Sequence, residues 1–316
     1  MRSRLVLLLA VATAVAAIAF TIPRLLPRHG APPVAHASLP PRLASYLGVF
    51  EQGAPPAYRP LQNFGEAAGR QPDLVGYFSG WAEPFDSSFA NSVNAHGAIV
   101  FVQIDPTYAS IAGIARGDYD SYLRSFADSV RVYRHPVVIG FGHEMNGTWF
   151  SWSRVRPAIF VAAWRHVVTL FRNDGARNVT WLWTINAEGR TGVRPPHQWW
   201  PGSDYVNWVG IDGFYFRPSD TFLNIFANTI KQVRSFTNKP VLLSETAAGP
   251  AAGQFLKIEN LFSGMDRYKT LGLVWFDINQ HAGVYHQDWR IEGHQGAEAA
   301  FRFGVRDHLR PADALQ

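Results

Sequence analysis

Two glutamates in this chain, Glu144 and Glu245, lie at the ends of short apolar runs of the sequence. Neither has a lysine or arginine beside it in the sequence, so a surface ion pair is not the expected role. Paired carboxyl groups about 5–5.5 Å apart can cleave a glycosidic bond with retention, because one protonates the leaving oxygen and the other attacks the anomeric carbon. The pair predicts a retaining glycoside hydrolase, with Glu144 as acid/base and Glu245 as nucleophile.

Three other carboxylates lie near predicted strand ends and compete for these roles. Glu188 stands close to Gly189 and Arg190, where a solvated ion pair is expected. Asp105 precedes Pro106 and is typical of a turn, although it could hydrogen-bond a sugar hydroxyl. Glu51 could do the same from the first strand. None has a better claim than the pair.

Other catalytic chemistries have weaker signals. His143 precedes Glu144, but the second histidine of a helical zinc motif is missing from the sequence. A metal-dependent hydrolase using His143 would be inhibited by chelators, whereas the carboxylate pair predicts no metal, no cofactor and no inhibition. Gly-x-Ser-x-Gly and the glycine-rich nucleotide-binding motifs are also absent from the sequence.

Eight short apolar runs alternate with longer segments of helical period, which is the pattern of βα units around a parallel sheet. Eight strands favour a closed barrel, so the predicted fold is α/β, a single (β/α)8 TIM barrel. Helices are expected at Tyr119 to Tyr133, Arg156 to Asn173, Thr221 to Phe236 and Phe255 to Lys269. The predicted strands are Tyr46 to Phe50, Leu74 to Phe78, Ala98 to Ile104, Pro136 to Phe141, Asn178 to Thr184, Trp208 to Ile211, Pro240 to Ser244, and Leu271 to Phe276.

The strand ends carry polar and aromatic residues, as expected where barrel enzymes place their chemistry. Glu144 follows the fourth predicted strand and Glu245 the seventh, so both should face one mouth. Trp81, Asp105 and Asn186 lie at other strand ends and are expected to bind substrate.

Composition fits one soluble catalytic domain with a large core. The chain has 316 residues, of which 47% are hydrophobic and 17% charged. Roughly two-thirds of its 11 tryptophans are expected to pack in the core or at interfaces, and the others could line a ligand site. Flat apolar faces of this kind suit sugar rings. The net charge of +5 is scattered rather than clustered, which argues against nucleic acid as a partner. We expect a monomer.

The N-terminus predicts export. Arg2 and Arg4 precede an uncharged, largely apolar stretch over residues 5–22, long for a signal-peptide core and just long enough to span a bilayer. We expect a secreted or extracytoplasmic protein, with residues 1–22 as signal peptide or membrane anchor. Residues 23–45 would form a Pro-rich linker and residues 46–316 the catalytic barrel.

The segment from Gly142 to Phe150, which reads Gly-His-Glu-Met-Asn-Gly-Thr-Trp-Phe, resembles the acid/base motif of glycoside hydrolase family 26. The segment from Lys239 to Glu245 is similar to the nucleophile strand of that family. Looser matches lie at Val209 to Tyr215 and Val274 to Phe276. The resemblance implies a retaining (β/α)8 enzyme with the acid/base after strand four and the nucleophile on strand seven.

Carried across position by position, the resemblance implies that His143 and Trp149 shape the subsite at the cleaved bond. It also implies that Tyr215 hydrogen-bonds the nucleophile and that Trp275 forms a platform under the sugar. Gly140 departs from the pattern, because the family usually has an arginine four positions before the acid/base.

The implied substrate is a β-1,4-linked polysaccharide. Endo-β-1,4-mannanase activity comes first, β-1,3-1,4-glucanase activity is the alternative, and xylan remains open. A function of another class is a non-catalytic carbohydrate-binding or envelope polysaccharide-assembly protein on the same barrel.

Overall fold

The computed structural model describes residues 38–187, 192–249, 253–280 and 287–310. These residues belong to one compact unit that spans Ala35–Gln316. The predicted export segment and most of the predicted linker lie outside the described residues. Within the described ranges, no helix combines the length and the apolar character that a membrane span requires.

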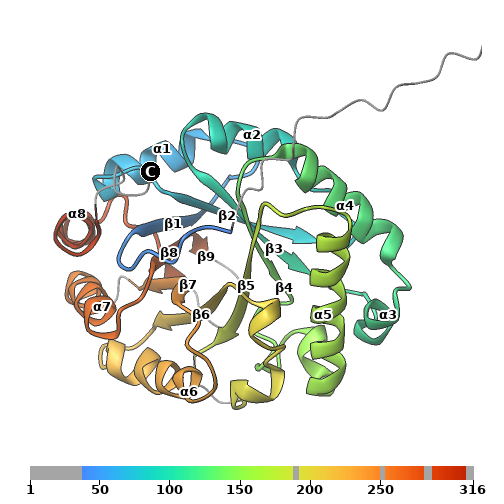
Figure 1. The fold of residues 1–316 in the computed structure, drawn as a ribbon. Helices are drawn as coiled ribbons and strands as arrows, with labels where there is room; N and C mark the ends of the chain where they lie inside the picture. The colour runs from blue at the N-terminus through green and yellow to red at the C-terminus, as the bar shows by residue number, and fades with distance from the viewer. Residues whose placement is uncertain (1–37, 188–191, 250–252, 281–286, 311–316) are drawn as a thin grey trace, which may run out of the picture. The chain divides into compact units, whose positions relative to one another are not determined.

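Eight parallel strands close into a barrel, which confirms the predicted fold (Figure 1). Each strand pairs with the next along the chain, and β8 pairs with β1. Every one of the eight predicted apolar runs coincides with a strand. The strands are β1 (Tyr46–Glu51), β2 (Leu74–Gly80), β3 (Ile99–Asp105), β4 (Val137–Phe141), β5 (Val179–Asn186), β6 (Trp208–Tyr215), β7 (Val241–Ala248) and β8 (Gly272–Asp277).

Helices surround the barrel on its outer side (Figure 1). The helix predicted over Thr221 to Phe236 begins with a π-helical stretch, Leu223–Ala227, before α6. A short antiparallel pair, β9 (Asn279–Gln280) with β10 (Gln287–Asp288), follows β8. The helices are α1 (Arg59–Ala68), α2 (Ser87–Ala95), α3 (Ile111–Arg116), α4 (Asp120–Tyr133), α5 (Pro157–Asn173), α6 (Asn228–Phe236), α7 (Gln254–Tyr268) and α8 (Gln295–His308).

The core has two layers, because successive strand residues face opposite sides of the barrel wall. The inner layer includes Tyr46, Leu182 and Trp208, whose side chains fill the barrel. The outer layer packs the wall against the helices, as where Trp181 of β5 meets Trp164 of α5 with ring centroids 6.3 Å apart. Strands buried on both faces explain why the sequence shows continuous apolar runs.

An irregularity in β7 sets the direction of Glu245. Leu242 pairs with Gly210 of β6, but Glu245 pairs with Asp212, so β7 contains one extra residue across this stretch. Leu242 faces into the barrel. Strict alternation would turn Glu245 outward, and the extra residue brings it onto the inward face beside Asp212.

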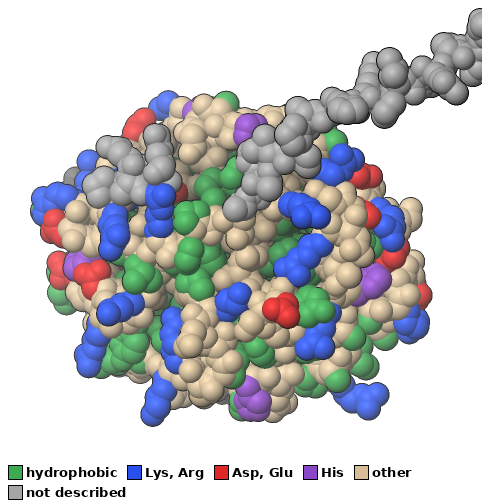
Figure 2. Space-filling view, viewed as in Figure 1, with side chains coloured by type: hydrophobic (Ala, Val, Ile, Leu, Met, Phe, Trp, Pro, Cys, Tyr) green, Lys and Arg blue, Asp and Glu red, His purple; other side chains and the backbone are tan. Residues whose placement is uncertain are grey.

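The surface charge is dispersed. Figure 2 shows Lys and Arg side chains spread over one face of the molecule, between acidic and uncharged ones. The net charge of +5 therefore forms no single basic patch on the visible part of this face.

Candidate active site

The turn after β4 positions Glu144 at the mouth of the barrel. Gly142 and Glu144 both adopt left-handed backbone conformations, with φ of 56° and 52°. Such a conformation is unfavourable for a glutamate and is held here by the surrounding structure. The Glu144 N–H donates to the carbonyl oxygen of Thr184 on β5, 3.0 Å away. The turn is thus tied to the neighbouring strand.

Both carboxylate oxygens of Glu144 accept hydrogen bonds. Trp149 donates its indole N–H to Oε2 across 2.6 Å, and Asn186 donates its side-chain amide to Oε1. Asn186 is held in turn by Asn146, because the two residues exchange two hydrogen bonds of 2.9 Å. The Glu144 carboxyl group therefore has a fixed orientation, and Trp149, 38% exposed, leaves part of its ring open to a ligand.

Glu245 has a different environment. It is only 6% exposed, and its Oε1 accepts no hydrogen bond from the described residues. Burial raises the pKa of Glu245 well above its ordinary value, and the charges of Asp212 and Glu144 raise it further. The charges of Glu144, Asp212 and Glu245 therefore act on one another.

Asp212 is a site residue that the sequence analysis did not single out. It is fully buried on β6, opposite Glu245, and its Oδ1 accepts a hydrogen bond of 2.6 Å from the Ser244 hydroxyl. Burial raises its pKa, as does the charge of Glu144, while His143 lowers it. Its position at a strand end was the signal in the sequence.

His143 pairs with Asp105, which lies at the end of β3. The ring Nδ1 is 2.9 Å from the Asp105 Oδ1. Burial opposes a charge on the ring, but Asp105 outweighs burial and raises the pKa of His143 to about 9. His143 also packs edge-on against Phe150, with centroids 4.7 Å apart. At neutral pH a buried cation thus stands beside Glu144.

The structure does not bring Tyr215 to the site, so the implied hydrogen bond to Glu245 is wrong. The Tyr215 hydroxyl lies 3.4 Å from the Asn260 Oδ1, and its ring packs against Phe226 in the outer layer. Asp212 faces inward, so Tyr215, an odd number of residues later on β6, faces outward. The side chain that faces the mouth from this strand end is Phe214, which has no hydroxyl.

Trp275 also lies in the outer layer, so its implied role as a sugar platform is wrong. It is fully buried, donates its indole N–H to the Trp289 carbonyl oxygen across 3.0 Å, and packs against Phe301 of α8. The inward residues of β8 are Val274 and then Phe276, which is half-buried. Trp275 is a packing residue.

In the described part of the chain, Asp105 joins the site through His143, whereas Trp81 and Glu51 have other neighbours. Trp81 packs edge-on against Tyr119 and Tyr122, with centroids 5.4 and 4.8 Å apart, at the start of α4. Glu51 groups with other acidic residues on the far side of the β1 and β8 wall, as described below. Glu188 lies outside the described residues.

A row of aromatic rings crosses the mouth from inward positions near strand ends. Phe78 of β2 stacks on Phe50 of β1 at 4.7 Å, and Phe50 contacts Phe276 at 6.4 Å. Phe214 then contacts Phe276 at 5.6 Å and Trp289 at 5.3 Å. Phe78, Phe214 and Phe276 are partly exposed and offer apolar faces of the kind that sugar rings pack against, whereas Phe50 and Trp289 are buried beside them. The sequence gives no signal for their facing directions, because these strands are apolar on both faces.

Gln103 of β3 fills the space at Gly140. A Cβ at Gly140 would lie 1.8 Å from the Gln103 Oε1. The fully buried Gln103 donates to the Thr184 hydroxyl across 3.2 Å. An uncharged amide therefore occupies the room beside Gly140, where the family pattern has an arginine.

Arg194 secures the loop that carries the acid/base motif. Its guanidinium donates to the carbonyl oxygens of Met145 and Ser153, at 3.1 and 2.6 Å, and to Asn146 at 3.3 Å. It also stacks over the Trp199 ring, 4.4 Å from the centroid. The sequence gave no signal for this role, because Arg194 lies on a distant loop.

Residues 118–305, more than half of the chain, match the sequence profile of "Glycosyl hydrolase family 26". The chain belongs to glycoside hydrolase family 26. The match includes Glu144 and Glu245, both of which sequence analysis had placed in that family's motifs.

Individual family relatives carry several activities in their names. The chain is 28% identical over 271 residues to Endoglucanase H of Acetivibrio thermocellus, which covers 80% of this chain and 29% of that protein. It is 26% identical over 159 residues to Beta-1,3-xylanase TXYA of Vibrio sp, covering 50% of this chain and 33% of that protein. The chain thus spans about a third of the length of these curated relatives.

Solved structures share the fold. The mannanase man26 of Bacillus subtilis covers 85% of this chain and 86% of its own, with a TM-score of 0.64 at 16% identity. An endo-beta-1,4-mannanase double mutant of Cellulomonas fimi covers 85% of this chain and 72% of its own, with a TM-score of 0.66 at 16% identity. At this identity the likeness supports the barrel architecture alone.

Proposed function

We propose that this family 26 chain is a retaining glycoside hydrolase that cleaves β-linked polysaccharide by double displacement. The observation that carries the proposal is the contrast between the environments of two glutamates whose charges act on each other. Glu144 has both oxygens fixed by N–H donors, whereas the buried Glu245 keeps Oε1 without a donor among the described residues. The two glutamates thus have different environments, as the separate roles of acid/base and nucleophile require.

In the first step, Glu144 transfers its proton to the glycosidic oxygen as the bond from that oxygen to the anomeric carbon breaks. A Glu245 oxygen attacks the same carbon from the opposite face, which gives a glycosyl ester and releases the leaving sugar as an alcohol. In the second step, Glu144 takes a proton from water, whose oxygen displaces Glu245. Two inversions give net retention.

The electrostatics of the site hold the pKa of Glu245 high. Ionising Glu245 is opposed by burial and by the charges of Asp212 and Glu144. Positive charge close to the acidic cluster would favour the ionised Glu245 that the first step needs. His143, with its pKa raised to about 9, supplies positive charge that offsets the acidic cluster.

The substrate is the finer part of the proposal. Family resemblance puts β-1,4-mannan first, and the name of the Piromyces relative, Mannan endo-1,4-beta-mannosidase A, agrees, although it is 23% identical over 45% of this chain. Mixed-linkage β-glucan is the second candidate, because Endoglucanase H matches 80% of this chain. The aromatic row suits either polymer, since both present apolar ring faces.

We also propose that the chain acts outside the cytoplasm, directed there by residues 1–22. Polysaccharide of this class is too large to enter a cell, and the apolar stretch over residues 5–22 is typical of an export signal. Fractionation should find the full chain in the medium or the membrane, and a chain lacking residues 2–22 in the cytoplasm. Equal distribution of both would refute export by this segment.

Hydrolysis of mannan, mixed-linkage glucan and xylan by the purified chain tests the activity. We expect product from one of the first two, and the anomeric NMR signal of the first product should be β. Glu245→Ala should lower kcat by roughly 10⁴-fold or more, whereas the exposed Glu259→Gln should not change it. An α product would refute retention. No product from any polymer would favour the carbohydrate-binding role.

A further inference from the structure

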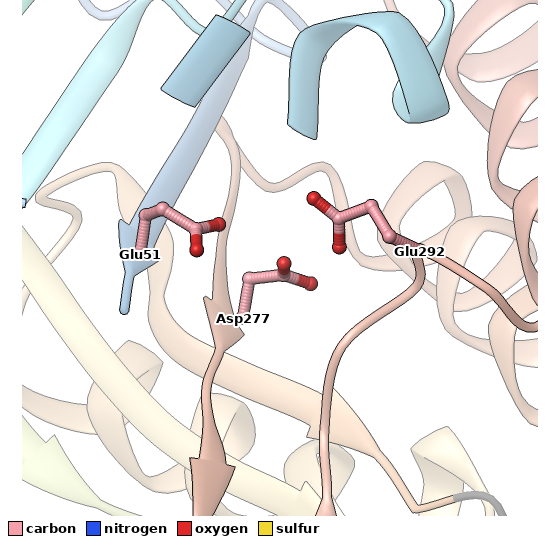
Figure 3. A group of neighbouring side chains, drawn as sticks. All are labelled: Glu51, Asp277 and Glu292. Atoms are coloured by element: carbon pink, nitrogen blue, oxygen red, sulfur yellow. The ribbon is translucent and has the colours of Figure 1, made fainter. Parts of the chain in front are cut away.

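Three carboxyl groups from distant parts of the chain converge beside the barrel wall (Figure 3). Glu51 ends β1, Asp277 ends β8, and Glu292 lies in the segment before α8. One oxygen from each lies within 4.8 Å of the others. Figure 3 shows the three groups turned toward a common space.

This acidic triad is separate from the Glu144 and Glu245 site. Glu51 and Asp277 are paired in register, and each directly follows an inward-facing phenylalanine, Phe50 or Phe276. Because facing alternates along a strand, the two carboxyl groups lie on the outer side of the wall. The mechanism proposed above makes no use of them.

The triad is largely buried and has few hydrogen-bond donors. Glu51 is 8% exposed and Asp277 is fully buried. The Ile291 N–H donates to the Asp277 Oδ1 across 3.0 Å. The second oxygen of each group, Glu51 Oε2, Asp277 Oδ2 and Glu292 Oε2, is buried and accepts no hydrogen bond from the described residues.

Arg290 does not neutralise the triad by direct contact. Its guanidinium donates two hydrogen bonds to Asp288, of 2.8 and 2.7 Å, and acts on Glu51 only through its charge. Burial raises the pKa of Glu51 to about 8, although a side-chain hydrogen bond with Asp277 acts to lower it. Buried carboxylates at such a distance need either shared protons or a cation.

The oxygen spacing fits a calcium ion. Oxygens bound to Ca²⁺ at about 2.4 Å can lie up to about 4.8 Å apart, and carboxylate oxygens are preferred ligands of this hard cation. Three carboxylates from three segments can surround one ion, and backbone carbonyls and water can complete its shell. Two protons, one on each glutamate and both directed at Asp277, are the other way to neutralise the triad, and calcium titration distinguishes the two.

We propose that Glu51, Asp277 and Glu292 form a structural calcium site. The ion would join the ends of β1 and β8 to the segment that carries Trp289 and Ile291. Trp289 contacts Phe214 at the barrel mouth, with centroids 5.3 Å apart. The site would therefore hold one end of the aromatic row in place without contacting the reacting atoms.

Calcium titration of the purified, chelator-treated chain tests the site. We expect calorimetry to detect about one Ca²⁺ per chain at pH 7.5, and saturating CaCl₂ to raise Tm by roughly 5 °C. Glu292→Gln, in a half-buried side chain outside the barrel strands, should lose both effects. Glu259→Gln removes the same charge from an exposed position on α7 and should keep both.

Other outcomes separate the alternatives. If neither Ca²⁺, Mg²⁺ nor Mn²⁺ binds in about one-to-one ratio, or if Glu292→Gln binds calcium as tightly as the unaltered chain, the proposal fails. A Tm that rises as pH falls through 8, with no response to ions, would instead establish shared protons. Chelation should leave activity unchanged well below Tm, so loss of activity at 25 °C with an unchanged Tm would also refute a purely structural ion.

Discussion

Replacing Tyr215 with phenylalanine tests whether Tyr215 faces outward, as the structure shows, or holds the nucleophile, as the family resemblance implies. If Tyr215 held the nucleophile, its hydroxyl would be needed for turnover, and its loss would lower kcat by roughly a hundredfold or more. The structure instead places this hydroxyl 3.4 Å from the Asn260 Oδ1, in the outer layer of the core. We expect Tyr215→Phe to leave kcat and KM within about twofold of their original values.

The expected stability change of Tyr215→Phe is also small. A hydrogen bond of ordinary geometry contributes about 0.5–1.5 kcal/mol, and one of 3.4 Å lies at the weak end of that range. Asn260 keeps a partner after the change, because the Phe222 N–H donates to the same oxygen across 2.7 Å. No buried acceptor is left unsatisfied. We therefore expect the free energy of unfolding to fall by about 0.5 kcal/mol.

Steady-state kinetics on the substrate found in the panel, together with urea unfolding, measure both quantities. Phe214→Ala is the matched comparison, since Phe214 is the neighbouring side chain that faces the mouth. It should raise KM severalfold, because its ring contacts Phe276 and Trp289 in the aromatic row. A hundredfold fall in kcat for Tyr215→Phe with an unchanged Tm would show that the facing assignment is wrong.

Four further substitutions test other parts of the site. Asp105→Asn should destabilise the fold by about 1–3 kcal/mol at pH 6. Because the pKa of His143 in the folded protein is raised to about 9 from about 6.5, the stabilisation by Asp105 should be complete below pH 6.5 and lost as pH rises through 9. Tm measured against pH tests this, and a difference in Tm that does not depend on pH would contradict the pairing. Asn146→Ala removes two buried hydrogen bonds to Asn186 and should lower the free energy of unfolding by about 2–3 kcal/mol. It should also lower kcat, because Asn186 orients Glu144. An unchanged kcat in a destabilised variant would show that Asn146 supports folding only. Phe276→Ala should raise KM severalfold, whereas Trp275→Phe should lower Tm and leave KM unchanged; the reverse pattern would return Trp275 to the mouth.

The sequence by itself determined the strands, their order and the two glutamates. Strands buried on both faces must be apolar throughout, so eight continuous runs predicted eight strands and a closed barrel. The carboxyl ends of barrel strands meet at one mouth, so positions after the fourth and seventh runs placed Glu144 and Glu245 together. The same rule placed Asp105 and Asn186 at this mouth, whereas their contacts with His143 and Glu144 appear only in the structure.

Only the tertiary structure decided which way each side chain faces. A continuous apolar run carries no alternation from which to read the inward face, so Tyr215 and Trp275 could be placed at the mouth when Phe214 and Phe276 occupy it. The extra residue in β7 that turns Glu245 inward is defined only by its pairing with β6. The acidic triad likewise depends on segments that closure of the barrel brings together, because Glu51 and Asp277 become neighbours only when β8 pairs with β1.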